Sequence, residues 1–124
     1  MKVDLSFFTQ REFTKGENEL PTVDEDTMVK AFARMLKEVR KASGYTLKQV
    51  AAETGVAFQS IARYEIGENI PNLIQAYKLA YFYEMSLHDM FFWGFLLLTN
   101  VIPEFDKGAW ELYKQQAKEK KNQG

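Results

Sequence analysis

Gln59, Ser60 and Arg63 are the residues of this 124-residue chain whose types and spacing best fit recognition chemistry. They lie within five consecutive positions, so they share one short stretch of chain. Glutamine and arginine can form paired hydrogen bonds to adenine and guanine edges respectively, and serine can bond to a base or a phosphate. Upstream, Thr46 would open a helix whose free backbone N–H groups can bind a phosphate. This pattern indicates a surface that contacts nucleic acid.

The residues that most catalytic and metal sites require are absent or isolated. The chain has no cysteine, which excludes a disulfide framework, a thiolate metal site and a cysteine nucleophile. It has a single histidine, His88, which cannot form a zinc site unaided. No Ser/His/Asp arrangement and no glycine-rich phosphate loop stands out. We therefore expect no enzyme activity, no metal and no cofactor. No small-molecule ligand is evident from the sequence. His88 is interpreted as a capped surface residue.

The elements that must position these residues are helices. Apolar residues recur at helical spacing over about residues 22–43, 46–54, 58–65, 73–83, 87–98 and 104–117, which predicts an all-α fold. Capping boxes pair Thr22 with Glu25 and Thr46 with Gln49, and Ser86 is a predicted N-cap. The fourth of these helices is marked by the apolar positions Leu73, Ala76, Tyr77, Leu79, Ala80 and Tyr83.

Two short helices joined through Gly55 have the sequence form of a helix-turn-helix. Ala51 must be small where the helices cross, Gly55 permits the sharp turn, and Val56 anchors the turn in the core. This stretch resembles the lambda-repressor/Cro-like (XRE-type) helix-turn-helix family, and the resemblance covers about residues 28–92. The matching positions are Thr46, Ala51, Gly55, Val56, Ile61, Arg63, Tyr64, Glu65, Gly67 and Pro71.

The resemblance implies a five-helix domain in which particular residues have particular roles. Gln59, Ser60 and Arg63 fall where the family reads bases, and Arg40 and Glu65 match its ion pair between helices. The remaining expected contacts lie mainly at or near the DNA backbone. The full set expected to bind DNA is Thr46, Leu47, Gln49, Phe58, Gln59, Ser60, Arg63 and Asn69.

The base-reading residues have structural alternatives. Arg63 can instead pair with Glu68 or Asp89 on the surface. Gln59 and Ser60 can be solvated helix positions without a partner.

Some positions depart from the family's pattern or stay ambiguous. Leu47 stands where the family often has a polar glutamine, and Glu68 occupies a turn position that is often basic. Ala57 replaces the usual Ser or Thr cap of the reading helix, at a cost of about 1 kcal/mol. Phe58 can contact thymine methyl groups or fold back into the core. These departures lower the expected attraction to phosphate.

The charge of the chain is unevenly distributed. The net charge is −4 over residues 1–27, +2 over residues 28–92 and +1 over residues 93–124, which gives −1 overall. Because a phosphate-binding face is a local property, this overall charge is weak evidence against DNA binding.

The chain is expected to have three parts: an N-terminal arm of residues 1–21, a helix-turn-helix domain of residues 22–92 and a C-terminal segment of residues 93–124. The start of the chain lacks the apolar stretch of a secretion signal, so we expect a cytoplasmic protein. The longest apolar run, residues 90–101, is shorter than the roughly 20 residues that cross a bilayer.

The C-terminal segment carries more large apolar side chains than a small domain needs for its own core. We expect these residues to form a homodimer interface, with Phe92, Trp93, Leu97, Trp110 and Tyr113 in it. The alternative is that the last helix folds back over its own core as a lid.

Together these observations predict a sequence-specific regulator of transcription that binds double-stranded DNA. A repressor acting as a homodimer on a two-fold symmetric operator fits best. The alternative is a protein-interaction module, such as an antirepressor or assembly factor, that keeps this fold without specific DNA binding.

Overall fold

The computed structural model describes residues 24–123, with side chains described as far as Glu119. This part contains six helices and no strands, which confirms the predicted all-α fold and its additional C-terminal helix. The helices are α2 (Glu25–Ser43), α3 (Leu47–Thr54), α4 (Phe58–Glu65), α5 (Leu73–Phe82), α6 (Leu87–Leu98) and α7 (Lys107–Gln123). The expected N-terminal arm, residues 1–21, lies outside the described residues.

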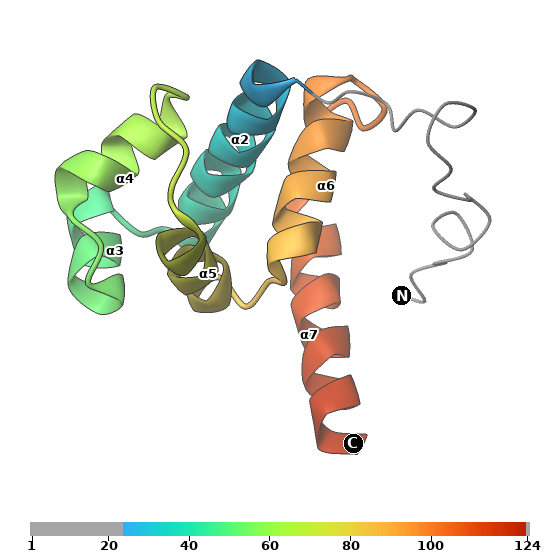
Figure 1. The fold of residues 1–124 in the computed structure, drawn as a ribbon. Helices are drawn as coiled ribbons and strands as arrows, with labels where there is room; N and C mark the ends of the chain where they lie inside the picture. Colours follow the sequence, from blue (N-terminus) through green and yellow to red (C-terminus); the bar gives the residue numbers. More distant parts are fainter. Residues whose placement is uncertain (1–23, 124) are drawn as a thin grey trace, which may run out of the picture.

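Helices α2 and α6 form the central pair of the fold and run in opposite directions (Figure 1). Their close approach requires Gly94, since a Cβ atom there would lie 2.0 Å from the backbone carbonyl oxygen of Ala31. Beside this point, Phe32 of α2 packs against Phe91 of α6 with ring centroids 4.7 Å apart. On one side of this pair lie α3, α4 and α5, and on the other lies α7 (Figure 1).

Side chains from all six helices meet in one hydrophobic core. The largest of those that are fully buried are Phe32, Met35, Leu36, Val39, Val50, Ile61, Leu79, Met90 and Leu97. Within this core α4 packs against α2, and α3 packs against α4 and α5. These contacts fix the position of the helix-turn-helix in the fold.

Capping explains where the first helices begin. Gln49 and Thr46 form the predicted capping box, with the Gln49 N–H donating to Thr46 Oγ1 at 3.1 Å and the Thr46 N–H donating to Gln49 Oε1 at 2.8 Å. The predicted start at Thr22 is wrong, because α2 begins at Glu25 with Asp24 as its cap. Asp24 Oδ1 accepts a 2.7 Å hydrogen bond from the Thr27 N–H. Hydrogen bonding to the Thr27 side chain, and next to this N–H, lowers the pKa of Asp24.

Helix α7 contacts α6 of the same chain through the Tyr113 side chain. The Tyr113 hydroxyl donates to Asp89 Oδ2 at 2.6 Å and accepts from the N–H of Ser86, the predicted N-cap of α6, at 3.2 Å. The Tyr113 ring also meets the Trp93 ring edge-on at 5.9 Å. Burial and the bond to Asp89 raise the pKa of Tyr113. These contacts make α7 a cover over the protomer's own core.

Leu97 and Trp110, two residues of the expected dimer interface, are buried in the single chain. Each is only 2% exposed in the single chain, so neither is available to a second copy. Leu97 lies three positions after Gly94, whose close approach to Ala31 marks the face of α6 that packs against α2, and Trp110 joins the core from α7. Phe92 is exposed, while Trp93 and Tyr113 are half-buried, so their place in an interface stays a prediction. The boundary expected after residue 92 falls inside α6.

Candidate nucleic-acid interface

A tight turn of residues 55–57 joins α3 to α4. Gly55 has a φ of +77°, the left-handed conformation that only glycine adopts without strain, and its N–H bonds to the Ala51 carbonyl at 2.9 Å. Val56, 3% exposed, and Ile61, 1% exposed, insert into the core directly after it. The turn therefore sets the angle between the two helices through buried contacts rather than through surface bonds.

The outer face of α4 carries the residues expected to read bases. Gln59 and Arg63 are exposed and Ser60 is half-exposed. None of these three side chains has a hydrogen bond or ion pair with another described residue. Arg63 therefore pairs with neither Glu68 nor Asp89 in the described structure, and Asp89 instead accepts from the Tyr113 hydroxyl. All three side chains are available to an external ligand.

Phe58 opens α4, and its side chain is 41% exposed, so it has not folded back into the core. Its ring adds an apolar edge to the outer face of α4. A thymine methyl group is the base feature that such an edge can contact.

Arg40 and Glu65 hold α4 in place. Arg40 Nε donates to Glu65 Oε2 at 2.7 Å and Arg40 Nη2 donates to Glu65 Oε1 at 2.9 Å, which makes a two-point ion pair between α2 and α4. The same guanidinium donates to the Tyr45 carbonyl at 3.1 Å and so ties the α2–α3 loop to the pair. The bond to Glu65 raises the pKa of Arg40. The structure thus contains the ion pair expected from the sequence, with Glu65 only 8% exposed.

Helix α4 is also bonded to α5. The Tyr64 hydroxyl donates a short hydrogen bond to Gln75 Oε1. Tyr64 is 7% exposed, so the bond lies at the edge of the core. The loop between the two helices carries Asn69, which is exposed and fits a contact to the DNA backbone.

The N-terminus of α3 is a second place where an anion can bind. Its first turn carries no acidic residue, and the described structure gives no partner for the backbone N–H groups of Leu47 and Lys48. The Leu47 side chain packs against the core, so its N–H is the group that can face a phosphate. Gln49 uses its carbonyl oxygen in the capping box, which leaves its NH₂ group for an external contact.

Lys48 is the residue of this site that sequence reasoning overlooked. It is exposed in the first turn of α3, beside the unpaired N–H groups. A lysine one position into a predicted helix was the available signal, because its ammonium adds a positive charge to the positive end of the helix dipole.

The departures from the family's pattern are visible in the structure. Ala57 gives α4 no side-chain cap, so the first N–H groups of that helix are left without one. Glu68 is exposed in the following turn. The missing cap at Ala57 leaves backbone N–H donors free for a phosphate, while Glu68 places a negative charge nearby.

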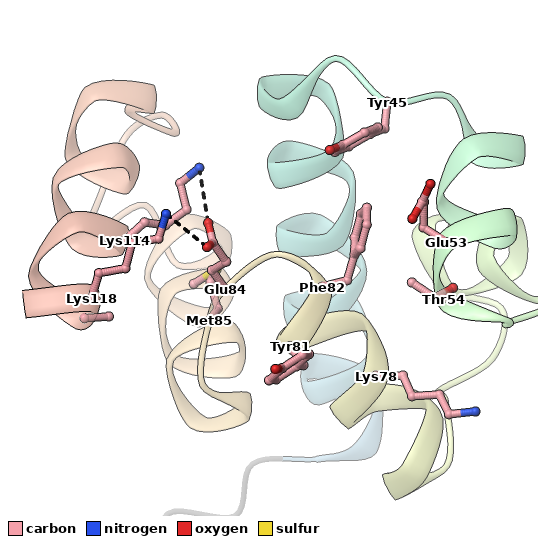
Figure 2. Close-up of a pocket in the computed structure, with 11 residues that line it drawn as sticks. Tyr45, Glu53, Thr54, Lys78, Tyr81, Phe82, Glu84, Met85, Lys114 and Lys118 are labelled. Atoms are coloured by element: carbon pink, nitrogen blue, oxygen red, sulfur yellow. Dashed lines mark ion pairs between the residues drawn. The ribbon is translucent and has the colours of Figure 1, made fainter. Parts of the chain in front are cut away.

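A hollow on the described surface lies away from the outer face of α4. It has a volume of about 820 Å³ and lies between α3, the end of α5 and α7. Figure 2 shows Tyr45, Tyr81 and Phe82 around it, with Glu84 reaching toward two lysines of α7. Glu84 pairs with Lys118 at 3.3 Å and with Lys114 at 4.0 Å. The residues that line this hollow thus supply ion pairs and aromatic rings rather than a nucleophile beside a base.

Two further searches of the described residues found nothing. No group of three or more His, Cys, Asp or Glu side chains in this part of the chain is placed to hold a metal ion. None of the described helices is both long and apolar enough to span a bilayer.

Comparison with known proteins agrees with this geometry. Residues 36–89 match a family described as helix-turn-helix, and this span contains all of α3, α4 and α5. Over 56 residues the chain is 32% identical to YgzD of Bacillus subtilis (strain 168), which is named as an uncharacterized HTH-type transcriptional regulator. That alignment covers 45% of this chain and 85% of the relative. No solved structure matches the chain.

Proposed function

Because the chain belongs to the helix-turn-helix family, we propose that it is a transcriptional regulator that binds specific sequences of double-stranded DNA. The observation that carries the proposal is the outer face of α4. Gln59, Ser60 and Arg63 project from one short helix without a partner among the described residues, while the Arg40–Glu65 pair holds that helix in position. Donor and acceptor groups fixed on a rigid element are what direct reading of base edges requires.

In the proposed complex, α4 enters the major groove and α3 lies across the DNA backbone. Arg63 reads a guanine, Gln59 an adenine, Ser60 a base or phosphate, and Phe58 a thymine methyl group. The N-terminus of α3, with Thr46, Leu47 and Gln49, and the loop residue Asn69 bind phosphates. These phosphate contacts set the register of α4 on the duplex, and the base contacts select the sequence.

The regulator is proposed to act as a homodimer in the cytoplasm. Two copies of α4 would enter successive major grooves about 34 Å apart and so recognise a two-fold symmetric operator. Repression follows most simply, because a bound dimer blocks the access of polymerase without any enzyme or effector domain. The proposed parts of the chain are an arm of residues 1–21, a helix-turn-helix domain of residues 22–92 and a C-terminal dimerisation segment of residues 93–124, with α6 crossing the second boundary.

Two features favour a second candidate function. Glu68 places a negative charge in the turn after α4, and Leu47 gives the start of α3 an apolar side chain in place of a polar one. A protein-interaction module that keeps this fold, such as an antirepressor or assembly factor, would tolerate both residues.

Selection of bound fragments from a random pool of DNA duplexes tests the two candidates directly. The regulator predicts enrichment of a two-fold symmetric sequence, whose binding weakens as salt rises because counterions are released from the phosphates. The matched control is the Gln59→Ala/Arg63→Ala variant, which keeps the buried contacts of α4 and should enrich nothing. If the wild-type protein retains no fragment even at low salt, the interaction module is the better description.

A further inference from the structure

Helix α5 exposes a continuous row of large apolar side chains. Leu73 is 73% exposed, Ile74 69%, Tyr77 61% and Tyr81 67%, and Ile70, just before the helix, is 47% exposed. At about 100° per residue, the four helical positions fall within an arc of about 100° on α5. The opposite side of α5 is the one that faces the core, through Ala76, Leu79, Ala80 and Tyr83. We refer to the five exposed residues as the α5 stripe.

The α5 stripe is large enough to be an interface. Taking about 200 Å² for a large side chain, the five exposed fractions correspond to about 600 Å² of surface in each protomer. A patch of this size is at the upper end of what a monomeric protein exposes. Two such patches facing each other would bury about 1,200 Å² in total, which meets the lower limit for a specific protein interface.

The composition of the stripe favours a second copy of this chain as the partner. None of its five residues is charged, and the helix that carries it has one charged residue, Lys78. A two-fold axis brings the same residues of two copies together, so a charged surface would repel itself while an uncharged apolar surface does not. The Tyr77 and Tyr81 rings already stack at 6.2 Å, which presents a flat aromatic face to a partner.

The dimer interface expected from the sequence, along α6 and α7, is a weaker candidate than the α5 stripe. Leu97 and Trp110 are buried within the protomer, and Tyr113 is bonded to Asp89 and Ser86 of its own chain. Three of the five side chains expected in that interface are thus buried or bonded within the protomer, while Phe92 is 52% exposed. The α5 stripe has no such partner among the described residues, because its members are at least 47% exposed.

The position of the stripe also connects dimerisation to DNA reading. α5 is bonded to α4 through the Tyr64 hydroxyl and Gln75 Oε1. Gln75 follows Ile74 of the stripe directly in the sequence, so one hydrogen bond and the body of α5 separate the apolar face from the base-reading helix. A dimer formed through α5 would therefore fix the relative orientation of two α4 helices over a short, rigid path.

We infer that the α5 stripe is the homodimer interface, with its two copies packed across a two-fold axis. The inference deepens the proposed function, because it names the surface that sets the spacing of the two reading helices. Self-association can be measured without DNA, so the interface and the DNA-binding proposal fail separately.

Sedimentation equilibrium of the full chain tests the inference with the Leu73→Glu/Tyr77→Glu variant. Both residues are exposed, and Leu73 lies in the first turn of α5, where a carboxylate favours the helix. The variant should therefore keep its helical circular dichroism while its dimer dissociation constant rises about 100-fold, as expected when two central contacts are lost. The matched control is Phe92→Glu, an exposed position on α6, which should leave the wild-type dimer intact.

A charge-swap experiment sharpens the result. Tyr77→Glu and Tyr77→Lys should each weaken self-association, and mixing the two variants should restore a dimer, because opposite charges then meet across the axis. A monomeric wild-type chain, or a dimer that Leu73→Glu/Tyr77→Glu does not weaken, would overturn the inference. If the dimer behaves as stated and no DNA is bound, the interface stands and the DNA-binding proposal fails.

Discussion

Arg40 and Glu65 are 25 residues apart in the sequence and are joined by two hydrogen bonds of 2.7 and 2.9 Å in the fold. The pair links the C-terminal half of α2 to the last residue of α4, and the guanidinium also bonds to the Tyr45 carbonyl. Both side chains are largely removed from water, with 16% and 5% exposed. The orientation of the proposed reading helix thus depends on an ion pair whose charges water could solvate only poorly if the pair were broken.

The first prediction concerns this pair. Arg40→Ala should lower the free energy of unfolding by about 3 kcal/mol or more, because it leaves the Glu65 carboxylate buried without a partner. The double variant Arg40→Met/Glu65→Leu should recover most of this loss, since it removes both charges and keeps apolar volume. Urea unfolding of the three proteins measures the difference. An unchanged transition midpoint in Arg40→Ala would show that the pair has no structural role.

The second prediction concerns the crossing of α2 and α6. Gly94→Ala should lower the free energy of unfolding by at least about 2 kcal/mol, because the added Cβ would meet the Ala31 carbonyl oxygen at 2.0 Å and backbone must move. Gly108→Ala is the matched control. Its Cβ meets only Asp106 Oδ1 at 3.3 Å, and alanine favours a helix, so stability should be equal or higher. Equal thermal stabilities of Gly94→Ala and Gly108→Ala would contradict the close crossing of α2 and α6.

The third prediction concerns alkaline pH. Burial, and next the charge of Glu65, raise the pKa of Tyr83 well above its ordinary value of 10. Because the unfolded chain loses this proton first, the stability contribution is complete below about pH 10 and is lost as the pH rises above it. Tyr83→Phe removes the titrating group, so its free energy of unfolding should fall less steeply than that of the wild type.

Urea unfolding at steps between pH 9 and pH 11 measures these slopes. Tyr81→Phe is the control, because it makes the same chemical change at a side chain that is 67% exposed. Equal slopes in the wild type and Tyr83→Phe would show that Tyr83 does not couple folding to pH in this range.

The parts of the fold that sequence could predict are those with local causes. The capping box of Thr46 and Gln49, the turn at Gly55 and the exposed face around Arg63 each depend on residues within a few positions. The Arg40–Glu65 pair is a long-range contact, and it was predictable only through the resemblance of this chain to a known family.

The parts that sequence could not predict depend on how helices dock. α5 has apolar residues on most of its circumference, so periodicity marked Leu73 and Tyr77 together with Leu79 and gave no sign that the first two face solvent. The burial of Trp110 depends on α7 docking on α6. Both outcomes follow from tertiary packing, which a helical pattern alone does not contain.

The last prediction tests the base-reading role of Arg63. Arg63→Ala should weaken binding to the selected operator by about 1–3 kcal/mol and relax the preference at one base position, because a bidentate contact to guanine is lost. Its stability should be unchanged, since the side chain is exposed and bonds to no other described residue. Lys37→Ala is the matched control, because it removes one exposed positive charge from a different helix, α2. It should shift affinity little and leave the sequence preference intact. Operator binding measured over a set of single-base variants separates the possible outcomes. A loss that is uniform over all sequences would make Arg63 a phosphate contact, and an unchanged affinity would remove it from the interface.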